Sequence, residues 1–363
     1  MAPKLLSKTE ENNNFYFTIT DIDVSIVNGL RRTILSDIPI IGFKTTPHDE
    51  NQCTIHTNTS RLNNEIIKHR LSCIPVHISD MSFPIDNYLL EVKKVNDSSE
   101  IQYVTTEDFN ILDINTKKYL SKGDREKIFP INEITGDFID FIRLRPKISN
   151  ELHGEELDLS CKFSVLSAKI NTVYNVTSMC YYTNTIDPIT HNDAWEKIKD
   201  KFDPSNLEYE KKNWKLLDGN RYFKKNHFDF VLKTLGIYEN IDIMKMACNI
   251  IIKQLNEISD NLDNNTLIKI SDAITTIPNC FNIKLINQDY TIGKIIEYFL
   301  YENYYLGSKQ LNYCGFIKEH PHDDYSIIRL GFINNSEEII VKQIFKSSLE
   351  KAVNLFDIIK ALF

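Results

Sequence analysis

Residues 19–34 read ITDIDVSIVNGLRRTI, and residues 285–300 read LINQDYTIGKIIEYFL. Aligned without a gap, these stretches place Asp23 on Asp289 and match apolar positions at Ile26/Ile292, Leu30/Ile296 and Ile34/Leu300. Each has the pattern of a strand, an N-cap of the Asp or Ser/Thr type, and a helix with one apolar stripe. The sequence therefore predicts an internal duplication, with one copy of this pattern in each half of the chain.

Each half also ends in a predicted long amphipathic helix. The first has an apolar stripe at Ile241, Met244, Cys248, Ile251, Ile252, Leu255 and Ile258. The second runs to the end of the sequence, with a stripe at Val341, Ile344, Phe345, Ser348, Leu349, Ala352, Phe356 and Ile359. Neither helix can bury its stripe alone, so each must pack on a partner. Residues 259–266 between them are polar and rich in turn formers, which predicts a linker near residue 260.

The first half is longer because of a predicted insertion at residues 78–166. Short alternating runs separated by Asn, Asp, Ser and Gly turns predict a β-rich subdomain there. The predicted fold class is α+β. We expect a first domain at 1–77 with 167–258, the inserted subdomain at 78–166, a linker at 259–266, and a second domain at 267–363.

Composition narrows the classes of function. The 363 residues carry a formal net charge of -8, which argues against a protein that grips duplex DNA by itself. No apolar run approaches the 18–20 residues that cross a bilayer, and no secretory signal is visible at the start, so we expect no membrane association. Seven scattered cysteines without a C-x-x-C motif indicate a reducing, intracellular compartment. Asparagine, 36 residues of the chain, indicates an AT-rich coding background.

Catalytic motifs are missing from the sequence. It contains no phosphate-binding glycine loop, no G-x-S-x-G elbow and no H-E-x-x-H. Asp21 and Asp23 lack the third carboxylate of a two-metal centre, so they are interpreted as a strand end and a helix cap. His320 and His322 flank Pro321 in a predicted strand connection. We therefore expect no catalytic residues, no cofactor and no metal. A free-standing metal-dependent enzyme and a DNA-binding regulator remain as alternatives.

One spacing resembles a zinc site. Cys53 and His56 are followed by His69 and Cys73, in the order C-x-x-H then H-x-x-x-C. A strand over 52–58 would send Cys53 and His56 to opposite faces. The pattern therefore predicts buried cysteines and polar histidines, and it leaves metal binding by these four residues open.

Two arginines lie on the first predicted helix. Arg31 and Arg32 are either solvated residues on its flank or contacts to another protein, for which arginine is favoured. Residues 58–71 predict a capped helix with a stripe at Leu62, Ile66, Ile67 and Leu71, and Glu65 and His69 have the spacing of an i,i+4 pair.

Together these segments resemble a known family. VNGLRRTILSDIP at 27–39, NTSRL at 58–62 and EIIKHRLSCIP at 65–75 resemble the bacterial alpha subunit of RNA polymerase and the third-largest subunit of RNA polymerase II. FNIKL at 281–285, DYTIG at 289–293 and NYCGFIKEHP at 312–321 resemble the eleventh subunit of that enzyme. Fused halves of this kind are most similar to polymerase subunits of large cytoplasmic DNA viruses.

The resemblance implies two alpha-type dimerisation domains fused as a pseudo-heterodimer. Such a subunit would be a non-catalytic platform that recruits the largest and second-largest polymerase subunits, binds small adaptor subunits and meets DNA only through the complex. If viral, it would act in the host cytoplasm and the virion. The resemblance implies subunit contacts at Asn28, Leu30, Arg31, Arg32, Glu65, His69 and Arg70. It implies pairing of the halves through Val27, Ile34, Ile251, Leu255, Ile292, Ile296, Phe299, Phe345, Leu349 and Phe356.

The sequence departs from the family's pattern in three places. The glycine expected after His69-Arg-Leu71 is Ser72, which leaves the fold expectation unchanged. Residues 78–100 contain no cysteine, so we expect no zinc loop there. The sequence stops after the second long helix, so we expect no C-terminal DNA-binding domain like that of the bacterial alpha chain.

Overall fold

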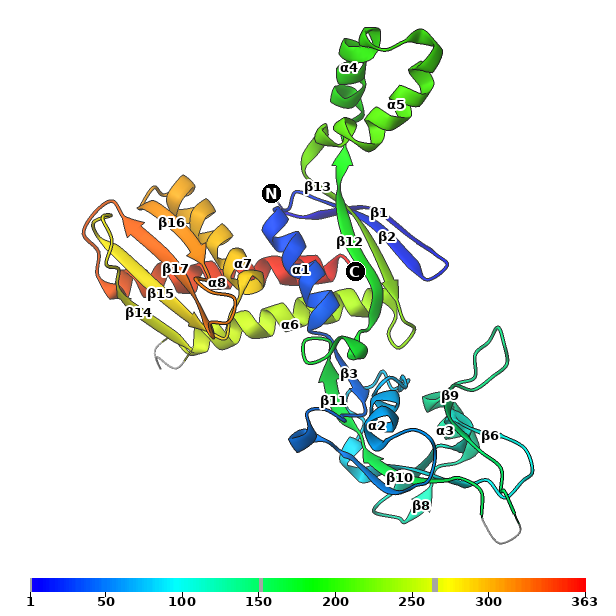
Figure 1. The fold of residues 1–363 in the computed structure, drawn as a ribbon. Helices are drawn as coiled ribbons and strands as arrows, with labels where there is room; N and C mark the ends of the chain where they lie inside the picture. The colour runs from blue at the N-terminus through cyan, green and yellow to red at the C-terminus, as the bar shows by residue number, and fades with distance from the viewer. Residues whose placement is uncertain (1, 150–152, 263–266) are drawn as a thin grey trace. The chain divides into compact units, whose positions relative to one another are not determined.

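A computed structural model of the chain describes residues 2–149, 153–262 and 267–363 (Figure 1). Its contacts divide the chain into two compact units. The first contains residues 1–37, 177–234 and 239–363, and the second contains residues 38–176 and 235–238. Both combine antiparallel strands with helices, so the mixed α+β class is confirmed.

The first unit contains two four-stranded antiparallel sheets. One has the order β1-β2-β13-β12, formed by β1 (Lys4–Glu11), β2 (Asn14–Thr20), β13 (Phe223–Thr234) and β12 (Thr177–Ile186). The other has the order β14-β15-β17-β16, formed by β14 (Ile268–Asp272), β15 (Cys280–Ile286), β17 (Tyr325–Phe332) and β16 (Leu311–Ile317).

Helices follow equivalent strands in the two sheets. In the first set, α1 (Val24–Ser36) follows β2 and α6 (Asn240–Asp260) follows β13. In the second, α7 (Tyr290–Leu300) follows β15 and α8 (Glu338–Ala361) follows β17. The same order of strands and helices, with the same neighbours in each sheet, therefore occurs twice in this unit.

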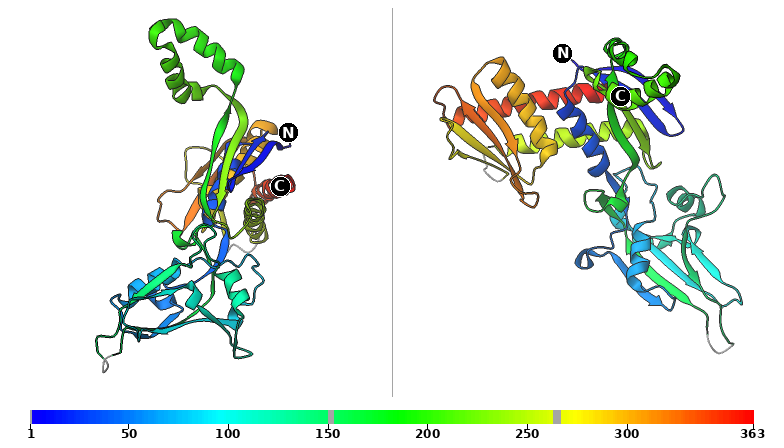
Figure 2. Two further views of the ribbon diagram at one scale, coloured as in Figure 1. Left: turned by 90° about the vertical axis from the view of Figure 1, so that its right-hand side faces the viewer. Right: turned by 45° about the horizontal axis from the view of Figure 1, so that its top comes forward.

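The four helices pack against one another. Helices α6 and α8 lie side by side along their length, and α1 packs on both α6 and α7 (Figures 1 and 2). The end of α8 reaches the first sheet, since the Phe363 ring centroid lies 5.0 Å from that of Phe17. At most 9% of the surface is exposed at each of Val27, Ile34, Ile251, Leu255, Ile292, Ile296, Phe299, Phe345, Leu349 and Phe356. The layer formed by α1, α6, α7 and α8 is thus the core that the two repeats share.

Two connections between equivalent strands differ in length. Between β12 and β13 the chain forms α4 (Pro188–Ile198) and α5 (Leu207–Leu216), and the rings of Trp195 and Trp214 pack at a tilt, with centroids 5.5 Å apart. Between β16 and β17 only residues 318–324 intervene. Helix α7 continues as a π-helix over Tyr301–Gly307.

The second unit has a five-stranded sheet of order β4-β10-β5-β7-β8. Its strands are β4 (Cys53–Asn58), β10 (Glu156–Lys162), β5 (Tyr88–Val95), β7 (Asn110–Asp113) and β8 (Lys118–Tyr119). Strand β3 (Pro39–Gly42) pairs with β11 (Ser164–Ser167), and β6 (Gln102–Thr105) pairs with β9 (Asp140–Leu144). Helices α2 (Asn64–Ser72) and α3 (Lys122–Ile128) complete it.

The second unit begins earlier than the predicted insertion at 78–166. Strand β4 pairs with β10 and β3 pairs with β11, so residues 39–58 are hydrogen-bonded to strands at the far end of the insertion. Helix α2 also buries Ile67 and Leu71 in the core of this unit. The predicted bounds were too narrow because the partners of β3 and β4 lie about a hundred residues away in the sequence.

Two smaller predictions were also wrong. Helix α2 begins at Asn64, capped by Asn63, so Leu62 precedes it, and Ile66 is 45% exposed instead of facing the core. Helix α6 extends to Asp260, so the predicted linker at 259–266 begins inside that helix, and its residues 263–266 lie outside the described residues. None of the described helices is long and apolar enough to cross a membrane.

Candidate functional site

The crossing of α1 and α7 joins the two repeats of the first unit. Asp23 caps α1 by accepting a hydrogen bond from the Ser25 amide at 2.8 Å, and Asp289 caps α7 in the same way from the Thr291 amide, also at 2.8 Å. Both predicted caps are confirmed. The helices approach closely at Gly29, where an added Cβ would lie 2.8 Å from Cδ1 of Ile295. Glycine thus permits this crossing.

Arg32 is bound within the chain at this crossing. Its guanidinium donates to the Thr291 hydroxyl at 2.8 Å and to the Asp289 carboxylate at 3.1 Å. Asp289 therefore both caps α7 and pairs with a cation on α1. The Arg32 and Asp289 side chains are 41% and 47% exposed, so water screens this ion pair. Arg32, for which a subunit contact was expected, thus links the two repeats within the chain.

The neighbouring residues of α1 point elsewhere. Leu30 is 1% exposed and belongs to the core, so it offers no surface to another protein. Asn28 and Arg31 are half-buried, and the Arg31 side chain donates to the Asn28 amide oxygen at 3.0 Å. Burial raises the pKa of the Cys180 thiol on β12 to about 12, and the nearby charge of Arg31 opposes that shift. The charge of Arg31 thus acts on β12, a strand of the first sheet.

We predict a small coupling between Arg32 and Asp289. In a double-mutant cycle with Arg32→Ala and Asp289→Asn, the coupling free energy should be below about 1 kcal/mol, because the pair is exposed. Asparagine keeps the cap, which isolates the charge contribution. Urea unfolding at low salt and at 1 M salt measures the coupling, which should shrink as salt rises. A coupling above 2 kcal/mol that salt leaves unchanged would contradict the screened ion pair.

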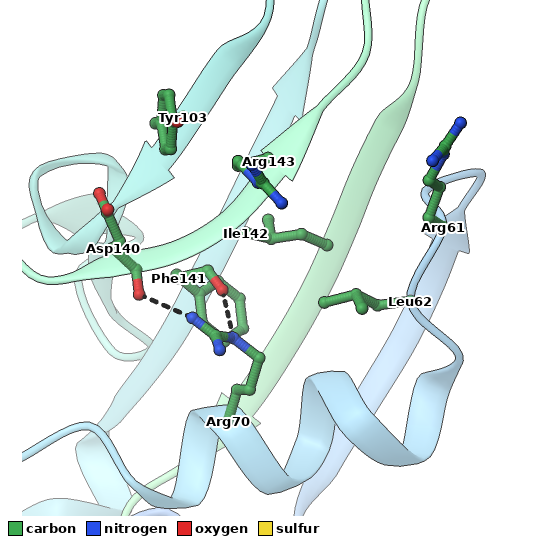
Figure 3. A pocket seen from close by; sticks show the side chains of 8 residues that line it. All are labelled: Arg61, Leu62, Arg70, Tyr103, Asp140, Phe141, Ile142 and Arg143. Atoms are coloured by element: carbon green, nitrogen blue, oxygen red, sulfur yellow. Dashed lines mark hydrogen bonds between the residues drawn. The ribbon is translucent and has the colours of Figure 1, made fainter.

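Helix α2 holds the second predicted contact segment. Arg70 is fixed by the backbone of β9, since its guanidinium donates to the Phe141 carbonyl at 2.6 Å and to the Asp140 carbonyl at 3.0 Å (Figure 3). Glu65 and His69 are exposed on the same helix, and the described residues show no ion pair between them. All three predicted contact residues of this segment are thus exposed, and Arg70 is held in place by β9.

A pocket of about 440 Å³ opens between α2 and the β6–β9 pair. Arg61, Arg70 and Arg143 line it, together with Leu62, Tyr103, Asp140, Phe141 and Ile142 (Figure 3). Tyr103 on β6 and Arg143 on β9 face each other across the strand pair. Arg61 and Arg143 were not singled out from the sequence. Alternation on β9 sends Arg143 outward beside the buried Ile142, but only the folded chain brings Arg61 near it.

A second cavity of about 270 Å³ lies in the same unit. The backbone and side chains of residues 72–77 form one wall, and Ile40, Gly42, Tyr174 and Leu235 contribute to the others. The Tyr174 hydroxyl donates to the Phe43 carbonyl at 2.9 Å, which ties the residues after β11 to β3. Burial lowers the pKa of His77, on the first wall, below its usual range.

The lowered pKa of His77 predicts a pH dependence of stability. Because the unfolded chain binds a proton at this histidine more readily than the folded chain does, stability should be complete above about pH 6.5 and fall as the pH drops through that value. His77→Gln should reduce this loss, measured by urea unfolding of the full chain at pH 7.5 and 5.5. The same substitution at the exposed His48 serves as control. Equal pH dependence in wild type and H77Q would contradict the prediction.

The zinc-like spacing does not assemble a four-ligand site. Cys53 is buried opposite Cys161, and the hydrogen bond between the two thiols, followed by burial, raises the pKa of Cys161. His56 lies 3.0 Å from the Ser160 hydroxyl, whereas Cys73 is exposed. Within residues 2–149, 153–262 and 267–363, no group of three His, Cys, Asp or Glu side chains could hold a metal ion.

The other candidate residues for chemistry have structural roles in the described chain. The His320 ring accepts a hydrogen bond from the His322 amide at 3.2 Å in the turn after β16. Asp21 follows β2 with a φ of 59°, and Asp23 is the cap of α1.

Comparisons with known proteins agree with the resemblance. A family model described as the RNA polymerase Rpb3/Rpb11 dimerisation domain matches residues 16–255. The chain is 27% identical over 165 residues to subunit rpac1 of DNA-directed RNA polymerases I and III of Dictyostelium discoideum, covering 42% of this chain and 44% of that protein.

Two further relatives extend the comparison. Human subunit RPAC1 of polymerases I and III is 26% identical over 170 residues, covering 41% of this chain and 44% of the relative. Subunit Rpo3 of DNA-directed RNA polymerase from Pyrococcus horikoshii is 32% identical over 94 residues, covering 26% of this chain and 31% of the relative. The chain thus matches less than half the length of these relatives.

Proposed function

The chain belongs to the RNA polymerase Rpb3/Rpb11 dimerisation family, and on that premise we propose that it is a non-catalytic assembly subunit of a DNA-directed RNA polymerase. Its relatives named above are subunits of such polymerases. The sequence offers no catalytic motif, so nucleotidyl transfer would belong to other subunits of the complex.

The observation that carries this proposal is the repeated topology of the first unit. Two sheets of the same strand order share one layer of four helices, which is the arrangement expected of two dimerisation domains joined in one chain. The family match ends at residue 255, before the second repeat, so the topology is the main support for a fused pseudo-heterodimer. Fusion would fix a one-to-one ratio of the halves and raise their effective concentration for each other.

We further propose the largest and second-largest polymerase subunits as partners, with small adaptor subunits and with DNA reached only through the complex. Of the predicted contact set, Glu65, His69 and Arg70 are exposed, and Asn28, Arg31 and Arg32 are half-buried. Leu30 would act indirectly because it is buried, whereas Arg32 and Arg70 are held in place by contacts within the chain.

Recruitment of the second-largest subunit tests this proposal. Co-expression of the tagged full chain with both large subunits should yield one complex, and isolation of the chain alone would contradict the proposal. Arg31→Ala combined with Arg32→Ala should weaken recruitment while the chain stays folded. Tested singly, Arg31→Ala should account for most of that loss, because Arg32 is bound to Asp289. Wild-type recruitment by the double variant would contradict the placement of an interface on α1.

The fusion has a test of its own. A protease site inserted within residues 263–266 of the full chain allows cleavage after folding. If α6, α8, α1 and α7 hold the halves together, the two products should elute as one particle in size-exclusion chromatography. Separation of the products in native buffer would contradict the pseudo-heterodimer.

We also propose a source and a compartment. The high asparagine content and the fused halves support an origin in a large cytoplasmic DNA virus, with action in the host cytoplasm and the virion. Localisation of the protein in infected cells tests this, and a nuclear location would contradict it.

A further inference from the structure

We propose that the pocket lined by Arg61, Arg70 and Arg143 is a docking site for a carboxylate-bearing segment of another polymerase subunit. This inference rests on the proposed function and adds to it a partner chemistry and a position on the second unit. This arginine pocket is lined by the three arginines together with Leu62, Tyr103, Asp140, Phe141 and Ile142 (Figure 3).

Most arginines of the chain are paired with a hydrogen-bond acceptor. The chain has nine, and seven have an acceptor: Arg31, Arg32, Arg70, Arg125, Arg145, Arg221 and Arg329. In the described part of the chain, Arg61 and Arg143 are the two without one, and both line the arginine pocket. In a protein with 50 acidic residues, two unpaired guanidiniums in one pocket leave the site open to an anion from outside.

The three arginines reach the pocket from different elements of the second unit. The Arg70 guanidinium stays at the pocket wall because it donates to two backbone carbonyls of β9. Arg143 extends from β9 opposite Tyr103, and Arg61 comes from the segment between β4 and α2. Three arginines thus reach one hollow from separate elements, with Asp140 as the one carboxylate among the eight lining residues, so the lining has a net positive charge that favours a negative group. The planar guanidinium of arginine can bind a carboxylate through two parallel hydrogen bonds.

The other side chains that line the pocket favour a protein segment over a nucleic acid. The pocket wall includes Leu62 and the buried Phe141 and Ile142, so apolar side chains could be buried beside the carboxylates. Single-stranded nucleic acid needs a basic track with several stacking aromatic rings, whereas the two rings that line this pocket are the exposed Tyr103 and the buried Phe141, and Asp140 lies on its wall. An acidic peptide segment with one or two apolar residues fits this surface better.

The test uses the full chain in the reconstituted polymerase. Arg61→Lys and Arg143→Lys keep the charge and introduce amines that a zero-length carbodiimide can join to carboxylates. We expect mass spectrometry to find cross-links from these amines to Asp or Glu residues of another subunit. Arg145→Lys is the matched control, since Arg145 directly follows β9 and is paired with Glu155. Its amine should cross-link within the chain, to Glu155.

A second measurement gives the size of the effect. Arg61→Ala with Arg143→Ala should weaken retention of the cross-linked subunit about tenfold, and more strongly at low salt than at high salt. The subunits that do not cross-link to the pocket should stay bound. An assembled complex without interchain cross-links at either position overturns the inference alone, as does ultraviolet cross-linking of the pocket to RNA or DNA. Failure of the wild-type chain to join any polymerase subunit overturns the proposed function as well.

Discussion

Ile359→Ala is expected to lower the free energy of unfolding by about 2–5 kcal/mol. Ile359 is fully buried on α8, where the helix end approaches the first sheet and Phe363 contacts Phe17. Removing three carbon atoms there leaves a cavity that a packed helical layer fills poorly. Because α8 follows the second sheet and ends at the first, the loss should destabilise both repeats together.

Ile358→Ala is the matched control for this prediction. The two residues are adjacent on α8 and have the same side chain, but Ile358 is 43% exposed. We expect its substitution to cost less than about 1 kcal/mol. Urea unfolding followed by circular dichroism measures both variants. Equal losses for the two would show that the face of α8 assigned to the core is wrong.

Gly293→Ala has the second large expected effect, a loss of about 1–3 kcal/mol. An added Cβ at this position of α7 would lie 1.9 Å from Cε2 of Phe316, far inside van der Waals contact. The ring has little room to move, since it packs on Tyr290 with centroids 5.1 Å apart and its backbone amide donates to Glu297 at 3.1 Å. The clash should outweigh the better helix propensity of alanine.

Gly123→Ala is expected to change the free energy of unfolding in the opposite direction. Gly123 also lies in a helix, α3, but nothing is within 4 Å of an added Cβ there. That substitution should be neutral or stabilising by up to about 1 kcal/mol. The difference in unfolding midpoint between the two variants measures the close approach of α7 to β16. A stabilised Gly293→Ala variant would contradict this packing.

Much of the first unit could be predicted from local patterns. Asp23 and Asp289 were expected as caps and are caps, because capping depends on residues two or three positions apart. The stripes of α6 and α8 were visible because a helical period repeats along the chain. A local signal was misread at Ile66: the helix begins at Asn64, and of the predicted stripe Ile67 and Leu71 are buried while Ile66 is exposed.

The candidate sites were less predictable, because they depend on residues far apart in the sequence. Nothing near Arg32 indicated that Asp289, on another helix, would bind it. Likewise, Arg61 and Arg143 come together only after β4 pairs with β10 and α2 packs beside β9. The unit boundary moved to residue 38 for the same reason, as the partners of β3 and β4 lie near residue 160.

By itself the sequence determined the first helix of each repeat with its aspartate cap, the buried faces of the two long helices, and the repetition of one pattern in both halves. These properties arise from neighbours within a few residues, whose spacing is set by backbone geometry. The tertiary structure alone decided which strands pair, that Arg32 joins the two repeats, and that two unpaired arginines share one pocket. Those outcomes depend on contacts between distant segments, where many pairings satisfy the same local pattern.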